Sequence, residues 1–443
     1  MTVEQITEPN RSSTSTAPAG YKQTELGIIP EDWCVSPIGQ THILATGTTP
    51  PTANTANYGD RYLFVSPADL GEAKYVLKTE KRLSERGFKL ARQYPSGSTL
   101  FTCIGSTIGK TGLSREILTS NQQINAIFPS NDSDPEFVYY AVTHIAPRVK
   151  ALAGQQAVPL VNKSEFGETL YCYPSSKTEQ TAIANALSDV DALIQELEKL
   201  IAKKQAIKTA TMQQLLTGRT RLPQFAHHPN GRKKGYKPSE IGEIPEDWRV
   251  LKLIDIATFI NGKPYEEFVV ENGKYQLITL DSVSISGVLK NKHKTVNFVD
   301  GSLSKGDLVC VLSDIAHARL LGLCGLIEDD GQYVLNQRMG RIRFHVDFHS
   351  EFMRYLINSK QEFFRNRGQG SSQRHIYKQD VFELELALPE KSEQVSIATV
   401  LSEMDQQIRA TEQRLSKTRQ IKQGMMQELL TGKTRLVKPA GAA

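Results

Sequence analysis

The feature that most constrains how this chain folds is a long helical segment that occurs twice. The first copy runs from Ser176 to Gly218, and the roughly 41 residues between them include no proline or glycine, which disfavour helix interiors. A helix of that length would extend about 60 Å at 1.5 Å per residue. When the chain is shifted by 214 positions, 20 of the 43 residues from 180 to 222 recur identically. The sequence therefore predicts two related long helices, each of which needs a packing partner.

Apolar residues in both segments step by four and three, the spacing typical of a coiled-coil seam. The predicted seam consists of Ile183, Leu187, Val190, Ile194, Leu197 and Ile201 in the first helix and Ile397, Leu401, Met404, Ile408 and Leu415 in the second. After Ile201 the rhythm weakens, because Lys204 and Lys208 fall on seam positions before an apolar face resumes at Met212. We therefore expect the second half of the first helix to pack on another part of the chain.

The ends of the first helix carry local signals. Ser176 and Glu179 have the spacing of a capping box, and Gly218 lies where a left-handed C-terminal cap favours glycine. A second motif is also duplicated, since Tyr21 to Val35 reads YKQTELGIIPEDWCV and Tyr236 to Val250 reads YKPSEIGEIPEDWRV. The chain is thus a tandem repeat in which each half has an IPEDW segment, a body of variable sequence and a long helix.

The two bodies share few residues, and short β-rich runs alternate in both with turns rich in Gly, Pro, Ser and Asn. A duplication that keeps its helices while its bodies diverge indicates a common frame whose bodies recognise different things. The predicted organisation is a disordered tail (1–20), a first body (21–175), a helix (176–218), a basic linker (219–235), a second body (236–390), a helix (391–432) and a C-terminal tail (433–443).

Composition limits the class of protein. Five cysteines without a CxxC motif are typical of reduced thiols, which predicts a cytoplasmic location. The sequence has no run of 18 apolar residues, so we expect no membrane span. A net charge of +5 is mildly basic and permits a polyanionic partner without requiring one.

As a whole, the arrangement resembles the specificity (S) subunit of type I restriction-modification enzymes. The resemblance covers nearly all of the chain after the tail and rests on the two bodies, the repeated helices, the IPEDW segments, SNQQINAI (Ser120 to Ile127), LNQRMGRI (Leu335 to Ile342) and the ending ELLTGKTRL. It implies an α+β fold in which two mixed α/β target recognition domains are separated by two long helices that form an antiparallel coiled coil with a pseudo-twofold internal repeat.

The same resemblance implies the partners. Each target recognition domain would read one half of an asymmetric, split site in double-stranded DNA, and the helices would fix the distance between the halves. Two methyltransferase (M) subunits and two restriction (R) subunits would assemble around the chain. S-adenosylmethionine, ATP and magnesium would belong to those partners, so we expect no cofactor, no metal and no catalytic residue in this chain.

Candidate DNA-reading side chains are arginines, lysines, amides and one histidine in turn-rich segments, because arginine matches guanine and glutamine matches adenine in the major groove. In the second body they are Gln337, Arg338, Arg365, Arg367, Gln369, Gln373, Arg374 and His375. In the first body they are Gln122, Gln123, Lys150, Gln155 and Gln156, and Thr107 and Lys110 are candidates for contact with the phosphate backbone. The pairs Asn121-Gln122 and Asn336-Gln337 occupy equivalent places, which favours a structural role as much as a DNA contact.

Other chemical motifs are weak or missing. Gly105 to Thr111 reads GSTIGKT, one residue short of a phosphate-binding P-loop, so a turn is favoured there. His345 and His349 have possible metal spacing, but a strand end on the surface is favoured. Two alternatives remain open, namely a single-chain DNA methyltransferase or nuclease with its own recognition domains, whose catalytic motifs we do not find, and a purely structural coiled-coil scaffold.

Overall fold

The computed structural model describes residues 17–437, apart from 155–157, 291–292, 316–318, 346–347 and 372. Most of the tail predicted to be disordered and the candidates Gln155 and Gln156 lie outside the described residues. The chain divides into two compact units, which we call unit 1 (1–198 with 414–443) and unit 2 (199–413). Each unit contains one body and one segment of each long helix.

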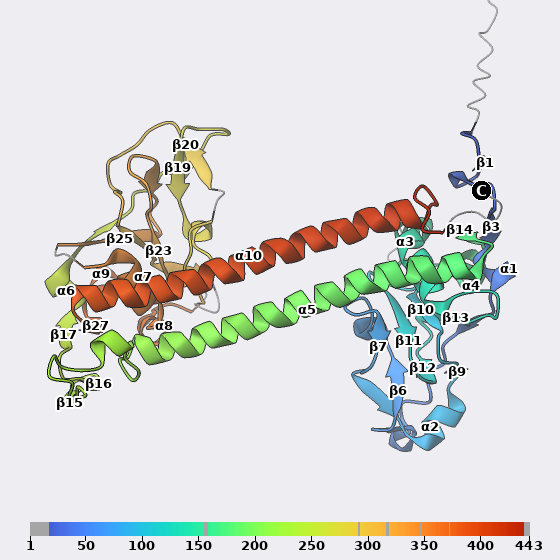
Figure 1. Ribbon diagram of the computed structural model, residues 1–443, viewed down its shortest axis with the longest axis horizontal. Coiled ribbons are helices and arrows are strands. Elements are labelled where there is room, and N and C mark those ends of the chain that lie inside the picture. The colour runs from blue at the N-terminus through green and yellow to red at the C-terminus, as the bar shows by residue number, and fades with distance from the viewer. Residues whose placement is uncertain are drawn as a thin grey trace, which may run out of the picture. The chain divides into compact units, whose positions relative to one another are not determined.

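The two repeated segments form the helices α5 (Lys177–Leu215) and α10 (Lys391–Leu429), of 39 residues each. Figure 1 shows α5 in green and α10 in red. They pack together as the predicted coiled coil and run antiparallel in each unit. In unit 2, for example, Lys204 on α5 contacts Gln407 of α10, whereas Lys208, one turn further along α5, contacts the earlier residue Asp405.

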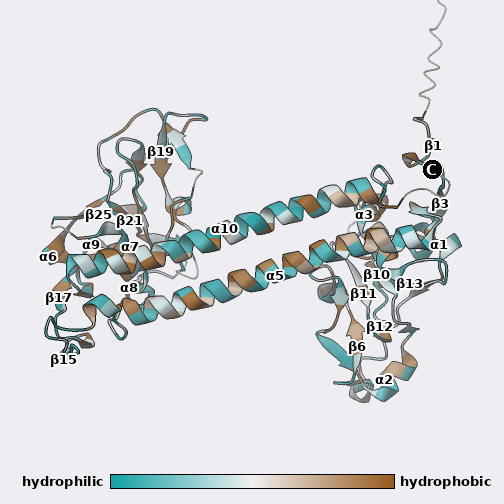
Figure 2. Ribbon diagram, viewed as in Figure 1, coloured by the Kyte–Doolittle hydropathy of each residue, from teal (hydrophilic) through white to brown (hydrophobic). Residues whose placement is uncertain are grey.

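The predicted seam is buried where the bodies cover it. Leu187 and Leu401 are fully buried, and brown apolar residues recur along both helices in Figure 2. The other buried seam residues are Ile183, Leu197, Ile397, Ile408 and Leu415, whereas the half-buried ones are Val190, Ile194, Ile201 and Met404.

Body 1 contains two five-stranded sheets, ordered β4-β13-β10-β11-β7 and β5-β8-β6-β12-β9, and two-stranded pairs β1-β2 and β3-β14. Its strands are β1 (Tyr21–Thr24), β2 (Gly27–Pro30), β3 (Trp33–Pro37), β4 (Leu44–Thr46), β5 (Tyr58–Gly59), β6 (Tyr62–Val65), β7 (Tyr75–Val76), β8 (Lys81–Leu83), β9 (Gln93–Tyr94), β10 (Thr99–Thr102), β11 (Thr111–Ser114), β12 (Leu118–Ser120), β13 (Ile124–Ile127) and β14 (Leu170–Pro174). Its helices are α1 (Ile38–Thr41), η1 (Thr55–Asn57), η2 (Pro67–Asp69), α2 (Glu85–Leu90), α3 (Pro135–Leu152) and α4 (Lys163–Glu168).

The core of unit 1 forms where α3 packs between the first sheet and the long helices. Asp134 caps α3 by accepting hydrogen bonds from the amides of Glu136 and Phe137. Helix α3 then buries a continuous apolar face that includes Phe137 and Val149. The same buried cluster contains Leu187 of α5 and Leu429 of α10, so body 1 is packed on both long helices.

Body 2 has the same plan with different strands, in sheets ordered β18-β25-β21-β23 and β20-β19-β24 and the pairs β15-β16, β17-β27 and β22-β26. Its strands are β15 (Tyr236–Ser239), β16 (Gly242–Pro245), β17 (Arg249–Lys252), β18 (Ala257–Asn261), β19 (Tyr275–Ile278), β20 (Lys294–Val296), β21 (Leu308–Val311), β22 (Ser313–Ile315), β23 (Cys324–Leu326), β24 (Tyr333–Leu335), β25 (Met339–Phe344), β26 (Gln373–His375) and β27 (Glu385–Leu388). Its helices are α6 (Leu253–Ile256), η4 (Glu266–Phe268), η5 (Leu280–Ser282), α7 (Ser350–Asn358), α8 (Gln361–Arg367) and α9 (Lys378–Phe382), and η3 (Pro223–Phe225) lies in the linker.

The core of unit 2 confirms the prediction for the second half of α5. Leu215 and Leu216 are buried in one cluster with Phe352 of α7 and with Leu401 of α10, and Met212 packs against that cluster. The apolar face that resumes after the seam therefore packs on body 2 as well as on α10. Within the described residues, no helix is long and apolar enough to cross a membrane.

Candidate nucleic-acid interface

Each unit holds the end of one long helix against the IPEDW segment of its body. In unit 2, α5 ends at Leu215 and the chain turns at Gly218, whose φ of +69° confirms the predicted left-handed cap. A Cβ on Gly218 would lie 2.4 Å from Cγ of Pro245 and 3.3 Å from the Trp248 ring. Glycine is therefore required there both for the backbone conformation and for the close approach.

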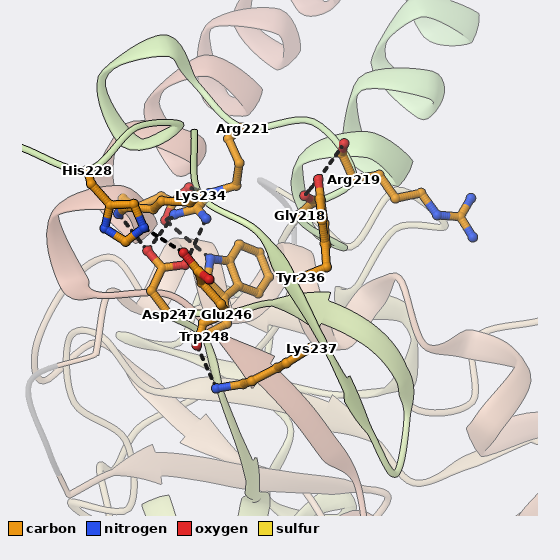
Figure 3. Close-up of polar contacts among 11 residues, drawn as sticks. Gly218, Arg219, Arg221, His228, Lys234, Tyr236, Lys237, Glu246, Asp247 and Trp248 are labelled. Atoms are coloured by element: carbon orange, nitrogen blue, oxygen red, sulfur yellow. Dashed lines mark hydrogen bonds and ion pairs between the residues drawn. The ribbon is translucent and has the colours of Figure 1, made fainter. Parts of the chain in front are cut away.

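An arginine just after this turn joins three parts of unit 2, as Figure 3 shows. The Arg221 guanidinium donates two hydrogen bonds to the Asp247 carboxylate, at 2.8 and 3.1 Å, and another to Oε2 of Glu393 on α10 at 2.6 Å. Although burial raises it, the hydrogen bonds from Arg221 and Lys234 lower the pKa of Asp247 to about 2. Burial lowers the pKa of Arg221, but the hydrogen bonds that it donates to Asp247 and Glu393 raise it by more, so that its net shift is upward.

The linker predicted to be basic is thus partly used inside unit 2. Besides Arg221, Lys234 donates to Asp247 at 2.7 Å, and Nε2 of His228 lies 2.6 Å from a Glu246 oxygen. Arg221 and Lys234 thus neutralise a carboxylate of the IPEDW segment (Figure 3). Arg221 and Lys234 therefore have a structural role, whereas Arg219, Arg232 and Lys233 of the linker are exposed.

A short loop approaches the Asn-Gln landmark in body 1. Gly47 packs so closely that a Cβ would lie 2.1 Å from the Asn121 carbonyl oxygen. The Asn121 side chain is used locally, because it accepts from the Gln123 amide and donates to the Gln123 side chain. Gln122 is exposed beside it and accepts a 2.5 Å hydrogen bond from Thr49. We call residues 47–51 with 121–123 tip 1.

Body 2 builds an equivalent tip, formed by residues 262–266 with 336–338, which we call tip 2. A Cβ on Gly262 would lie 2.0 Å from the Asn336 carbonyl oxygen. Asn336 is buried and donates a hydrogen bond to Glu266. Gln337 and Arg338 are exposed beside it. In both tips, therefore, the shared asparagine holds the turn, and the exposed side chains that follow it are available to a ligand.

The segment 363–378, which contains six of the candidate DNA-reading residues of body 2, is more ordered than a polar loop. It forms the end of α8, a turn at Gly370 and the strand β26, which pairs with β22. Arg367 lies over the Phe363 ring and 3.7 Å from Glu383, while Arg374 donates to the backbone of Arg365. His375 is 2.9 Å from the Ser313 hydroxyl, Gln373 is half-buried, and Arg365 and Gln369 are exposed.

The GSTIGKT loop of body 1 faces α5. Thr107 and Lys110 line a cavity of about 660 Å³ together with Lys150 and with Asp191 and Glu198 of α5. The amides of Ile108, Gly109 and Lys110 donate to backbone oxygens nearby. A phosphate cradle needs such amides to point at the ligand, so the loop is a turn, as predicted.

One basic surface of body 1 was not identified from the sequence. Lys78, Lys81, Arg86 and Arg92 are exposed on and around α2, and Phe88 stacks on Tyr62 beside them with ring centroids 3.9 Å apart. Figure 1 shows α2 at the end of body 1 that is farthest from α5. Cations interleaved with aromatic rings suit phosphate contact. The excess of Lys and Arg between residues 78 and 92 was the signal that could have identified this surface.

Metal binding finds no support in the part of the chain that is described, where no group of three or more His, Cys, Asp or Glu could hold an ion. His349 instead caps α7, because its ring accepts a hydrogen bond from the Phe352 amide.

Comparison with known proteins gives consistent matches. A family model described as the type I restriction modification DNA specificity domain matches residues 30–209 and 245–420. The chain is 27% identical over 430 residues to the type I restriction enzyme MjaVIII specificity subunit of Methanocaldococcus jannaschii, covering 92% of this chain and 94% of that protein. The crystal structure of a type I restriction-modification system S subunit from M. genitalium matches with a TM-score of 0.57 at 16% identity, over 90% of this chain and 96% of that one. This structural match carries the fold alone.

Proposed function

The chain belongs to the type I restriction-modification DNA specificity family and is a specificity subunit, and from that premise we propose that its bodies read the two different halves of a split DNA site. The observation that carries the proposal is the pair of tips. They have the same glycine and asparagine framework, and each exposes the glutamine that follows the asparagine, Gln122 in tip 1 and Gln337 in tip 2. The other exposed side chains differ, because tip 1 presents Thr49 whereas tip 2 presents Lys263 and Arg338.

The different side chains favour an asymmetric target. Glutamine can pair with adenine through two hydrogen bonds, and arginine can pair in the same way with guanine. The cations around α2 would hold the DNA backbone without reading bases. Tips 1 and 2 would therefore read unlike half-sites, separated by base pairs that neither body reads.

We further propose that the chain acts in the cytoplasm, that it has no catalytic activity or cofactor of its own, and that two methyltransferase and two restriction subunits assemble on it. S-adenosylmethionine, ATP and magnesium would be bound by those partners. A single-chain methyltransferase or nuclease is not favoured. That alternative predicts that the purified chain alone modifies or cuts DNA.

The test is to map methylated bases genome-wide in cells that carry the chain with its methyltransferase partner. We expect one motif with two unlike halves and an unread gap, and a continuous or palindromic motif would contradict the proposal. Gln122→Ala should relax only one half-site and Arg338→Ala only the other, because loss of one bidentate contact removes about 1–3 kcal/mol of discrimination. Gln406→Ala, at an exposed position of α10, is the matched control.

A further inference from the structure

A buried triad of tyrosine, aspartate and lysine occurs at equivalent places in the two units. In unit 1, the Tyr140 hydroxyl of α3 donates a 2.6 Å hydrogen bond to Asp191 of α5, and Nζ of Lys422 on α10 lies 2.6 Å from the other carboxylate oxygen. In both units the triad joins the body to both long helices.

The triad of unit 2 repeats these contacts with residues from the other half of the chain. Tyr355 of α7 donates a 2.6 Å hydrogen bond to Asp405 of α10, and Lys208 of α5 donates one of 2.5 Å to the same carboxylate. Lys208 lies over the Tyr355 ring at 5.3 Å, and Lys422 lies over the Tyr140 ring at 5.6 Å. The bodies have otherwise diverged, so both copies have kept this set of contacts while the surrounding residues changed.

These contacts explain why Lys208 occupies a seam position. Its side chain is 12% exposed and that of Asp405 is 11% exposed, so the pair is largely removed from water. A buried ion pair adds little stability compared with apolar packing, but removing one partner is strongly unfavourable. In coiled coils, buried polar residues of this kind specify the register of the helices.

Attraction between lysine and a carboxylate would not select the register by itself. A shift of α10 by one heptad would bring Glu412 opposite Lys208 and Glu198 opposite Lys422. Glu198 is exposed, so pairing with it gains little. The tyrosines, in contrast, hold Asp405 in a buried position and Asp191 in a half-buried one, where a shift would leave each carboxylate without its cation.

We propose that Tyr140 and Tyr355 are positioning residues that fix the antiparallel register of α5 and α10, and thereby the distance between the two half-sites. Tyr140 holds Asp191 of α5 as the partner of Lys422 on α10, and Tyr355 holds Asp405 of α10 as the partner of Lys208 on α5. A shift of one heptad corresponds to about 10 Å along the helices, or about three base pairs of DNA. The predicted effect of the tyrosines on the gap between the DNA half-sites rests on the proposed function. Their predicted effect on the register of α5 and α10 does not.

The first experiment uses the full chain with its methyltransferase partner and compares Tyr140→Phe combined with Tyr355→Phe against Tyr171→Phe. Tyr171 is a matched control, because it is buried in body 1 and its hydroxyl bonds to Thr41 of the same body at 2.9 Å. In the double variant, methylation at sites with a gap altered by about three base pairs should rise about a hundredfold over wild type, about tenfold for each of the two hydrogen bonds to a charged acceptor that are lost. The half-site sequences should not change.

An unchanged gap profile, with methylation reduced as in Tyr171→Phe, would overturn the proposal, because a merely stabilising role lowers activity without altering the gap. If the wild-type chain itself specifies no split site, the proposed function fails, and the register is then decided by the second measurement alone.

The second experiment reads the register without DNA, by crosslinking cysteine pairs with a short thiol reagent. Glu198 and Arg419 are 2.6 Å apart in the native register, so Glu198→Cys with Arg419→Cys reports that register. Glu198→Cys with Met426→Cys reports a shift of one heptad. The ratio of shifted to native crosslink should rise about a hundredfold in the double tyrosine variant, which loses two hydrogen bonds to carboxylates, and stay at the wild-type value in Tyr171→Phe. An equal ratio in all three proteins would show that the tyrosines do not set the register.

Discussion

In unit 2, Arg221 binds Asp247 and Glu393, and in unit 1 Arg435 makes the same contacts with Asp32 and Glu179. The Glu179 side chain, which the sequence suggested as a helix cap, is thus a partner of an arginine 256 residues away. Hydrogen bonds with Asp32 and Glu179 raise the pKa of Arg435. The arginine contacts with the aspartate and the glutamate are therefore the same in both units.

Away from the frame the two units differ. Near the triad, unit 1 buries Lys74, which pairs with Glu136 at 2.8 Å. Unit 2 instead uses Arg354 of α7, which pairs with Glu351 and also donates to the Gly287 carbonyl. The two glutamates occupy equivalent positions, and each unit pairs its glutamate with a buried cation from a different element. The glutamate on the helix of each body therefore has to be neutralised in both units, but the cation that neutralises it differs. The bodies can for this reason differ in sequence and in the surface that they expose.

The largest effect is expected from separating the two halves of the chain. This tests whether the contacts of Arg221 and those of Arg435 are interchangeable. A fragment of residues 1–226 contains Asp32, Glu179, Asp191, Lys208 and Arg221, which is one copy of every frame partner. We expect it to form a twofold dimer in which Arg221 of each copy takes the place of Arg435 in the other. With a methyltransferase partner, that dimer should methylate a palindrome of the first half-site.

Sedimentation measures the self-association directly. The fragment should be dimeric at micromolar concentration, and Arg221→Ala should make it largely monomeric. A monomeric wild-type fragment, or a dimer that recognises no symmetric site, would show that the two frames are not interchangeable.

A smaller effect is expected from breaking one frame in the full chain. Arg221→Ala leaves the Glu393 side chain, which is 3% exposed, buried without its arginine. Removal of one partner from a buried ion pair costs about 3–5 kcal/mol. The chain has two tryptophans, and Trp33→Phe leaves Trp248 as the sole reporter, so denaturant unfolding followed by fluorescence measures unit 2.

Arg249→Ala provides the control in the same background. Arg249 is 72% exposed and lies 3.7 Å from Glu390, so its loss should change the free energy of unfolding by less than about 1 kcal/mol. Equal destabilisation by the two substitutions would contradict a special role for the Arg221 network.

The units should also differ in their response to acid. Burial lowers the pKa of His42 in unit 1 to about 4, and its ring lies 2.9 Å from the Ser133 hydroxyl. Because the folded pKa is below the unfolded value of about 6.5, the unfolded state binds the proton first. The contribution of neutral His42 to the free energy of unfolding of unit 1 is therefore complete above pH 6.5. It falls by about 3 kcal/mol as the pH drops to 4.

Position 257, the repeat equivalent of His42, is an alanine, so unit 2 lacks this group. In a Trp248→Phe background, the fluorescence of Trp33 reports the unfolding of unit 1. His42→Gln should reduce the change in the free energy of unfolding of unit 1 between pH 6.5 and 4. An unchanged slope in His42→Gln would assign the acid sensitivity to other groups.

The frame was predictable from the sequence because its signals are local or repeated. The seam of α5, the turn at Gly218 and the duplicated IPEDW segments each follow from spacing or from internal identity. The Arg221–Glu393 contact was not predictable, because it joins residues 172 positions apart and both are charged residues that are usually exposed. The tips were located only by the shared Asn-Gln pairs, and the DNA contacts of the candidate side chains stay predictions.

The smallest and most specific effect concerns the spacing of the half-sites. Seven residues inserted in α5 between Glu198 and Lys199 preserve the heptad phase and add about 10 Å, equivalent to about three base pairs. Inserted alone, they leave α10 short, so part of the insert can loop out, and we expect a gap one to about three base pairs longer with reduced activity.

A second insertion of seven residues between Gln413 and Arg414 lengthens α10 at the point where the chain divides, just as the first does in α5. Each triad, and each of the Arg221 and Arg435 networks, lies entirely within one unit. The two insertions at the unit boundaries therefore leave all of these contacts in place. The double insertion should therefore recover activity relative to the single one and should lengthen the gap by about three base pairs. Methylation mapping decides the matter, because an active double variant with an unchanged gap, or with altered bases inside a half-site, would show that the helices do not set the distance between the sequences that the two bodies read.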